Sequence, residues 1–342
     1  MRFHLFVTAA VLTSLSAGAL VSCSLSGSAS PPAKSLAAAG TRSTTSLLDV
    51  AAARNLPTDV ASRLPLSSTP MRVRPDTSGA PKLLAVADFG TLAVEILNSS
   101  YHLKTTISSG LSEPVSDWYD TAGNLYVADV HNGIVEYAPG ATSPTYVYSN
   151  GTADAIEATT DEAQHVYASN HNLSNGGYIT EYAHRSNTVL HQCTVGNGAG
   201  LQGIAVDEKG DVFASVDTTG GPGFVEFKRG LSGCKQTVLG AIVSNTGGMQ
   251  LDNKNDLVEC DQTAHTVDIV APPYKKVTST ITGFADPYNV ALNKNNTLVF
   301  VADPQNRDVV VDNYPSGTNV TTLGSSNGLN DPAGPAVNPV ER

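Results

Sequence analysis

Carboxylate and amide side chains recur at two fixed positions of a repeated segment in this chain of 342 residues. An acid or an amide occupies the first position in five repeats out of six, and the second position, three residues later, in two. The candidate ligand-binding residues, expected to face a common channel, are Glu113, Asp154, Glu157, Asn245, Asp286, Asn289 and Asp331. Oxygen ligands suit a hard divalent cation such as Ca²⁺, so Glu157, Asn245, Asn289 and Asp286 form a candidate metal set. The competing interpretation is that a channel mouth is wet and polar without binding anything.

Two other sequence segments resemble catalytic motifs but lack the secondary structure that those motifs need. Residues 324–328 spell Gly-Ser-Ser-Asn-Gly, but the Gly-x-Ser-x-Gly nucleophile motif needs a strand, a sharp turn and a helix. Residues 198–203 spell a dinucleotide fingerprint, yet a strand pattern follows instead of a helix whose N-terminus could bind pyrophosphate. A lyase would need a histidine beside a carboxylate, for which His171 and His265 are candidates.

The elements that must position these residues follow from an internal repeat. A short apolar strand ending in Asp or Asn recurs six times, and the final residues are 41, 41, 47, 44 and 42 positions apart. These final residues are Asp88, Asp129, Asn170, Asp217, Asp261 and Asp303. A tight turn precedes most of these strands and two further strands follow, which makes four strands per ~42 residues, the period of a propeller blade.

The first and last segments of the repeated region together supply the strands of one blade. Residues 83–88 have the pattern of a blade's second strand, whereas residues 328–337 have that of an innermost strand with no blade after it. We therefore predict an all-β, six-bladed β-propeller over residues 78–342, whose C-terminal strand closes the first blade. The recurrent Asp and Asn are expected to accept backbone N–H bonds from the following turn. A further acidic row is expected on a solvated strand face and comprises Glu95, Glu136, Glu181, Glu226 and Asp268.

The repeat resembles NHL repeats, most fully from Gly283-Phe-Ala-Asp-Pro287 to Val301-Ala-Asp-Pro-Gln-Asn-Arg307. The ring as a whole resembles NHL and, more distantly, gluconolactonase-like or regucalcin-like propellers. That resemblance implies a divalent ion held by channel-facing residues, which polarises a lactone carbonyl and activates water. The chain departs from those enzymes: it has neither their Glu-x-Pro-x-Trp stretch nor their Pro-Asn-Gly loop, and Trp118 follows Glu113-Pro-Val-Ser-Asp instead.

Residues 1–22 have the features of a secretory signal peptide, because Arg2 precedes an apolar run too short to span a bilayer comfortably. The run ends in Leu20-Val-Ser-Cys23, which resembles the lipobox of bacterial lipoproteins. The resemblance implies acyl chains such as palmitate on Cys23, which would hold the mature chain on a membrane. Residues 23–77 are rich in Ser, Ala and Pro, which predicts a disordered tether. An ordinary signal peptide with a chance cysteine is the alternative.

The amino-acid composition excludes one class of partner, and the cysteines other than Cys23 have separate expected roles. The chain has 31 acidic and 20 basic residues and no basic cluster, which argues against nucleic acid as a partner. Cys260 occupies a position that is small and apolar in most other repeats, so we expect it in the core. Cys193 and Cys234 lie in consecutive repeats and are a candidate disulfide pair.

Together these observations favour a non-catalytic binding propeller, tethered to the surface of the bacterial cell envelope and monomeric. It would lie on the outer membrane of a Gram-negative organism, because Ser24 resembles the residue of outer-membrane-sorted lipoproteins. Its partner would be a protein, a glycan or a small molecule at the channel face. The alternatives are a divalent-metal-dependent lactonase or esterase-like hydrolase and, third, a propeller lyase.

Overall fold

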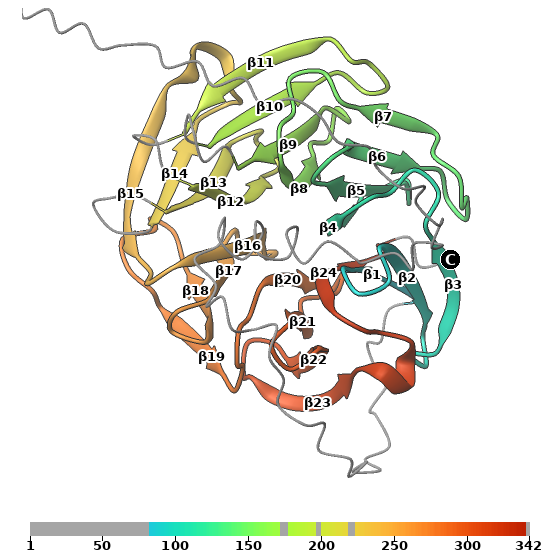
Figure 1. The fold of residues 1–342 in the computed structure, drawn as a ribbon. Helices are drawn as coiled ribbons and strands as arrows, with labels where there is room; N and C mark the ends of the chain where they lie inside the picture. The colour runs from blue at the N-terminus through green and yellow to red at the C-terminus, as the bar shows by residue number, and fades with distance from the viewer. Residues whose placement is uncertain (1–81, 172–176, 196–199, 218–222, 340–342) are drawn as a thin grey trace, which may run out of the picture. The chain divides into compact units, whose positions relative to one another are not determined.

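The computed structural model describes residues 82–171, 177–195, 200–217 and 223–339. The predicted signal peptide and tether therefore lie outside the described residues. The described chain forms six sheets of four antiparallel strands each, arranged around a central axis (Figure 1). The prediction of an all-β, six-bladed propeller is confirmed.

Each blade consists of an innermost strand beside the axis and three further strands toward the outside, in that order. Blade 1 comprises β24 (Pro332–Val337), β1 (Leu83–Asp88), β2 (Ala93–Asn98) and β3 (Leu103–Ile107). Blade 2 comprises β4 (Pro114–Tyr119), β5 (Leu125–Asp129), β6 (Gly133–Tyr137) and β7 (Tyr146–Tyr148). Blade 3 comprises β8 (Ala155–Thr160), β9 (Val166–Asn170), β10 (Tyr178–Tyr182) and β11 (Val189–Thr194).

The remaining blades have the same strand order. Blade 4 comprises β12 (Gly200–Val206), β13 (Val212–Asp217), β14 (Gly223–Phe227) and β15 (Gln236–Ile242). Blade 5 comprises β16 (Thr246–Leu251), β17 (Leu257–Asp261), β18 (Thr266–Val270) and β19 (Ser279–Thr282). Blade 6 comprises β20 (Asn289–Leu292), β21 (Leu298–Asp303), β22 (Asp308–Asn313) and β23 (Thr318–Leu323).

The ring closes through blade 1. β24, the last strand of the chain, pairs antiparallel with β1, the first, with Leu84 opposite Val337 and Asp88 opposite Pro332. The predicted closure by the C-terminal strand is therefore confirmed, and it covers the edges that β1 and β24 would otherwise expose.

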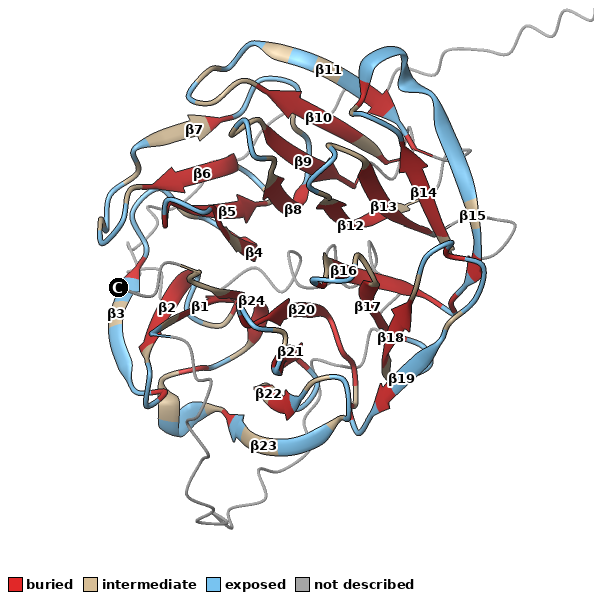
Figure 2. Ribbon diagram, turned by 180° about the vertical axis from the view of Figure 1, so that it is seen from behind, coloured by how far each residue is buried: buried red, intermediate tan, exposed pale blue. Residues whose placement is uncertain are grey.

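Burial falls from the axis outwards (Figure 2). The second strands are buried on both faces, as in β5, because neighbouring blades pack against each side of the sheet. The outermost strands are largely exposed, and β15 shows Val238 and Ile242 to solvent. Cys260 is fully buried in β17, as expected for a small core residue. In the part of the chain that the structure describes, no helix has the length and apolar character needed to cross a membrane.

The recurrent Asp residues organise the loops at one face of the ring. Oδ1 of Asp129 accepts the backbone N–H groups of His131 and Asn132 in the following turn, as predicted. Its Oδ2 accepts those of Ser112 at 2.7 Å and Glu113 at 2.8 Å. The same carboxylate thus also fixes the loop that enters the innermost strand of its blade.

The acidic row of the third strands is buried, so the expectation of a solvated face was wrong. Glu95, Glu136, Glu181, Glu226 and Asp268 are at most 8% exposed. Blade neighbours cover both faces of each sheet, and these carboxylates are paired there: Glu136 contacts the guanidinium of Arg185 at 2.8 Å and accepts the Tyr148 hydroxyl at 2.8 Å. Because buried acids require partners, the row is a set of interior polar links.

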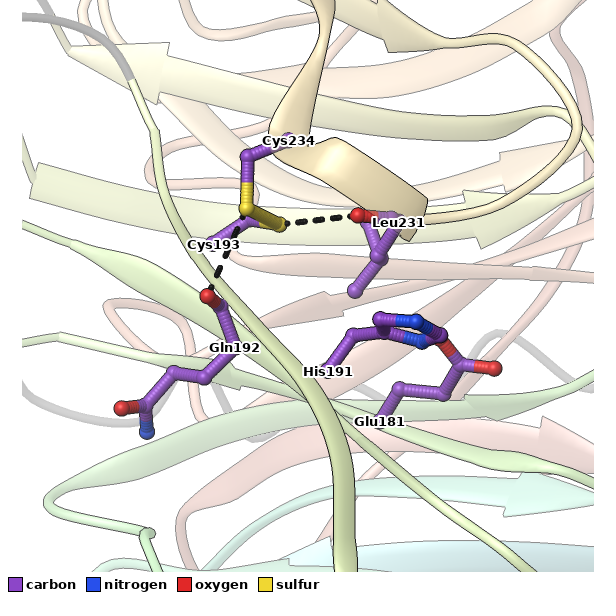
Figure 3. Close-up of a disulfide and its surroundings, with 6 residues drawn as sticks. All are labelled: Glu181, His191, Gln192, Cys193, Leu231 and Cys234. Atoms are coloured by element: carbon purple, nitrogen blue, oxygen red, sulfur yellow. Dashed lines mark hydrogen bonds and ion pairs between the residues drawn. A yellow bond between two sulfur atoms is a disulfide. The ribbon is translucent and has the colours of Figure 1, made fainter.

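A disulfide joins the outer parts of blades 3 and 4. Cys193 in β11 is bonded to Cys234, the last residue of the short 3₁₀ turn η1 (Ser232–Cys234). Figure 3 shows the carbonyl oxygens of Leu231 and Gln192 in contact with the two sulfur atoms. The bond spans 41 positions, so it links consecutive repeats rather than two strands of one sheet.

Candidate functional site

The half of the channel where the innermost strands begin is filled by apolar side chains. Phe89, Val115, Ile156, Tyr288 and Ala333 form one buried cluster. They come from the start of innermost strands, or the loops beside them, in blades 1, 2, 3 and 6, so they can only meet near the axis. An apolar cluster therefore lies at the face for which the oxygen-rich mouth was predicted.

The next layer of the channel is closely packed because glycine occupies it in several blades. A Cβ atom on Gly334 would lie 2.5 Å from Cα of Ser116 in the neighbouring blade. A Cβ atom on Gly248 would lie 2.3 Å from Oδ1 of Asn289. These distances are far below van der Waals contact, so a larger residue would force the blades apart at Gly334 and would do the same or displace the Asn289 amide at Gly248.

Glu157 is the link between blades in this layer. Its Oε2 accepts the backbone N–H of Ile204 in blade 4 at 2.7 Å, and its Oε1 accepts that of Met249 in blade 5 at 3.4 Å. Burial raises the pKa of Glu157 to about 8, although these two donors and the side chain of Asn289 lower it. The carboxyl group therefore sits on the axis with polar partners from three other blades.

Five of the other predicted site residues lie nearer the strand entrances and have separate surroundings. Glu113 contacts His131 at 3.1 Å, and Asn245 donates its amide to Oε1 of Gln262 at 3.0 Å. The structure places Asp154 in an exposed position, Asp331 in a half-buried one and Asp286 in a buried one.

The candidate metal set is not a compact cluster of acids. No group of three or more His, Cys, Asp or Glu within the described ranges is placed to hold a metal ion. Within the set, Glu157 and Asn289 are in hydrogen-bond contact, whereas the amide of Asn245 is engaged by Gln262. A metal at Glu157, Asn245, Asn289 and Asp286 stays a prediction.

A cavity of about 330 Å³ lies on the axis, at the ends of the innermost strands opposite their entrances. All six innermost strands contribute to its wall, including Trp118 of β4, Met249 of β16 and Leu292 of β20. Of the seven predicted ligand-binding residues, only Glu157 lines it. The cavity and most of its wall were missed from the sequence, because the repeated acids and amides pointed to the opposite face.

One sequence signal was available for this face. The hairpins between innermost and second strands each begin with an Asp or Asn, and Asp120, Asp161, Asp207 and Asn293 line the cavity. These side chains form hydrogen bonds within their own hairpins: Asp120 accepts the backbone N–H groups of Ala122 at 2.9 Å and Asn124 at 2.8 Å. They shape the hairpins and also bring negative charge to the cavity rim.

Comparisons with known proteins identify the fold of this chain but no family. No family model matches this sequence, and no curated protein matches it either. Among solved structures, the chain is similar to one chain of the nidogen/laminin complex, with a TM-score of 0.60 and 14% identity over 75% of this chain and 98% of that one. It is also similar to a protein of unknown function from Bacteroides caccae, with a TM-score of 0.59 and 12% identity over the same shares, 75% and 98%. The shared property at such identities is the propeller fold alone.

Proposed function

We propose that this chain is a lipid-anchored propeller of the bacterial cell envelope that binds a ligand without transforming it. The observation that carries the proposal is the wall of the axial cavity. Its described lining residues are carboxylates, amides, apolar and aromatic side chains, two threonines and one lysine, with no Ser, Cys or His among them. Hydrolysis through an acyl-enzyme commonly uses a Ser or Cys nucleophile beside a His base, so this wall fits recognition better than that kind of turnover.

Export and anchoring are supported by two independent features. Leu20-Val-Ser-Cys23 resembles a lipobox at the end of a signal peptide. The bond between Cys193 and Cys234 suits an oxidising compartment outside the cytoplasm, where structural disulfides persist. Membrane attachment through Cys23 would present the propeller to partners at the envelope surface.

The metal-dependent lactonase remains the second candidate, because Glu157 and Asn289 of its predicted ligand set are in contact on the axis. In that case a divalent ion would polarise a lactone carbonyl and activate water. A structural role of Glu157 would compete with metal binding, because the backbone N–H groups of Ile204 and Met249 already donate to its two oxygens.

Metal content separates the two functions. Full-length protein, purified after exposure to Ca²⁺, is analysed for bound metal, and its thermal midpoint is measured with Ca²⁺ and with chelator. A binding propeller is expected to carry no stoichiometric metal, to keep its midpoint and to leave lactone and ester substrates intact. One equivalent of metal with a chelator-sensitive midpoint, both absent from Glu157→Gln, would instead favour the hydrolase candidate, because a native-state ligand raises stability, and hydrolysis of a lactone or ester would then establish it.

Anchoring is tested by fractionation. The wild type is expected in the membrane fraction with incorporated labelled palmitate, and Cys23→Ser is expected to lose the label and leave that fraction. A Ser22→Ala variant next to the acylated position serves as the matched control. Equal partitioning of the wild type and Cys23→Ser would contradict the lipid anchor.

A further inference from the structure

The axial cavity has a strongly uneven charge. Seven of its lining residues are acidic, whereas Lys294 is its one basic residue. Glu162 and Glu208 are exposed at the rim, and Asp117 and Glu157 are buried in the wall. Burial raises the pKa of Asp117 and Glu157, so the negative charge comes mainly from the five acids of the hairpins at the rim. A concave site focuses such charge, so the cavity attracts cations and repels anions.

Asp117 adds an observation that the acidic rim alone does not provide. It is 6% exposed, and neither of its carboxyl oxygens has a hydrogen-bond partner of normal geometry among the described residues. Burial raises the pKa of Asp117 well above its ordinary range, and the backbone N–H of Ala87 lowers it only in part. Burial of a carboxyl group is costly when its one donor, the N–H of Ala87, offsets it only in part, so the presence of Asp117 in a cavity wall points to a further donor supplied by a ligand.

The rest of the wall suits an apolar body. Trp118 adjoins Asp117, and its indole N–H donates to Oγ1 of Thr160 in blade 3 at 3.0 Å, which fixes the ring in the wall. Buried Met249 and Leu292 face the cavity from blades 5 and 6. Aromatic rings attract organic cations through their faces, while aliphatic walls favour apolar groups over fully hydrated ions.

Size and spacing distinguish an organic cation from a bare metal ion. A volume of about 330 Å³ lies in the range of small-molecule sites. Of the lining acids, Asp117 and Glu157 lie in innermost strands and the other five lie in the hairpins that follow β4, β8 and β12. No three metal-ligating side chains are gathered in the described part of the chain. A single small ion would therefore reach few of them, whereas a molecule that fills the cavity can meet Asp117 and the rim acids together.

We propose that the axial cavity binds a small organic cation, an ammonium group on an aromatic or aliphatic body. Asp117 receives the ammonium group, Glu162 and Glu208 raise the local concentration of cations, and the ring of Trp118 packs against the ligand. This inference rests on the proposed binding function and names the ligand class of its site.

Trp118 is the only tryptophan of the chain, so its fluorescence reports on this cavity. Full-length protein in detergent micelles is titrated with phenethylammonium and with phenethyl alcohol, a neutral molecule of the same size, and micelles with free tryptophan derivative serve as the blank. The expected result is a saturable change with a half-saturation about tenfold lower for the ammonium compound. The neutral disaccharide maltose is titrated in the same way. Equal affinities for the ammonium compound and the alcohol, no saturable change, or a preference for maltose would each overturn the proposal.

Three variants test which residues cause the preference for the ammonium compound. Glu162→Lys/Glu208→Lys changes exposed rim residues and is expected to weaken ammonium binding by about tenfold while leaving the alcohol unchanged. Asp117→Asn should remove the preference for the ammonium compound. Glu95→Gln, which changes a buried acid in blade 1 outside the cavity wall, should behave as wild type. Retention of the preference in both the rim variant and Asp117→Asn would overturn the proposal even if Asp117→Asn were poorly folded.

Mass analysis of the recovered ligand separates this inference from the function it rests on. Unchanged phenethylammonium after prolonged incubation agrees with binding without turnover. A new product together with charge-selective binding would refute the non-catalytic function and keep the cation site. Loss of charge selectivity in a protein that stays membrane-anchored and inactive would refute the cation site and keep the binding propeller.

Discussion

The backbone N–H of Asp331 donates to Oδ1 of Asp88 at 3.1 Å, although the two residues are 243 positions apart. The N–H of Asn330 donates to Oδ2 of the same carboxylate at 2.7 Å, and that of Thr91 to Oδ1 at 3.0 Å. In blade 2 the equivalent Asp129 binds residues 16 and 17 positions away, because there the chain is continuous. The same device that shapes a local loop in one blade thus joins the two ends of the propeller in another.

Asp88→Ala is predicted to loosen the ring closure. Removing a charged acceptor from three backbone donors should lower the free energy of unfolding by on the order of 3 kcal/mol. Amide hydrogen exchange in β24 should accelerate selectively, since β24 is held to blade 1 at this end of the strand. Asp129→Ala is the matched control, with a similar loss of stability and unchanged exchange in β24. Equal exchange in β24 of both variants would contradict the closure role.

The architecture was predictable because its causes are local and repeat. Each blade repeats the strand-ending Asp or Asn and most repeat the hairpin turn, so the period, the number of blades and the closing strand could all be counted from the sequence. The acidic row that includes Glu95 and Glu136 was misplaced, because alternation along a strand cannot reveal that neighbouring blades cover both faces. Burial by a neighbour 40 residues away is a tertiary fact.

The site was less predictable, because the channel is shaped by groups that are distant in the sequence. The cluster of Phe89, Ile156 and Tyr288 that fills one half of the channel comes from three blades. The direction of the Glu157 side chain, toward Ile204 and Met249, depends on how the blades meet at the axis. The alignment of repeats could place Glu157 and Asn289 in one row, but not show that this row packs tightly and that the cavity lies beyond it.

Gly248→Ala is predicted to disrupt that packed row. The new Cβ atom would lie 2.3 Å from Oδ1 of Asn289, so the two blades must separate or the amide must move. The expected loss is about 1–3 kcal/mol in the free energy of unfolding, measured by urea denaturation. Because the clash is with one side chain, the same substitution should cost less in an Asn289→Ala background. Fully additive costs in this double-mutant cycle would exclude the contact as the cause.

Removal of the disulfide is predicted to destabilise the propeller without changing its fold. Cys193→Ala/Cys234→Ala releases a cross-link spanning 41 positions, and the expected loss is about 2–4 kcal/mol from the greater freedom of the unfolded chain. Reductant should lower the unfolding midpoint of the wild type and leave that of the double variant unchanged. Reductant sensitivity that persists in the double variant would contradict this disulfide as the source of the effect.

The stability of the propeller should also depend on the protonation of Asp308 at the start of β22. Burial, followed by the nearby Asp303 carboxylate, raises the pKa of Asp308 to about 7. The folded state therefore keeps this proton from about pH 4 to 7, where the unfolded chain has lost it. Since the folded state binds more protons in that window, the contribution of Asp308 to stability falls as the pH rises and levels off above its folded-state pKa.

Asp308→Asn tests this dependence directly. The variant cannot ionise at this position, so it should be more stable than the wild type near pH 8, and the difference should vanish near pH 4. Urea unfolding at several pH values measures the difference, and Asp154→Asn, which removes an exposed acid, controls for net charge. A difference between Asp308→Asn and wild type that is the same at all pH values would show that the carboxyl group titrates alike in the folded and unfolded states.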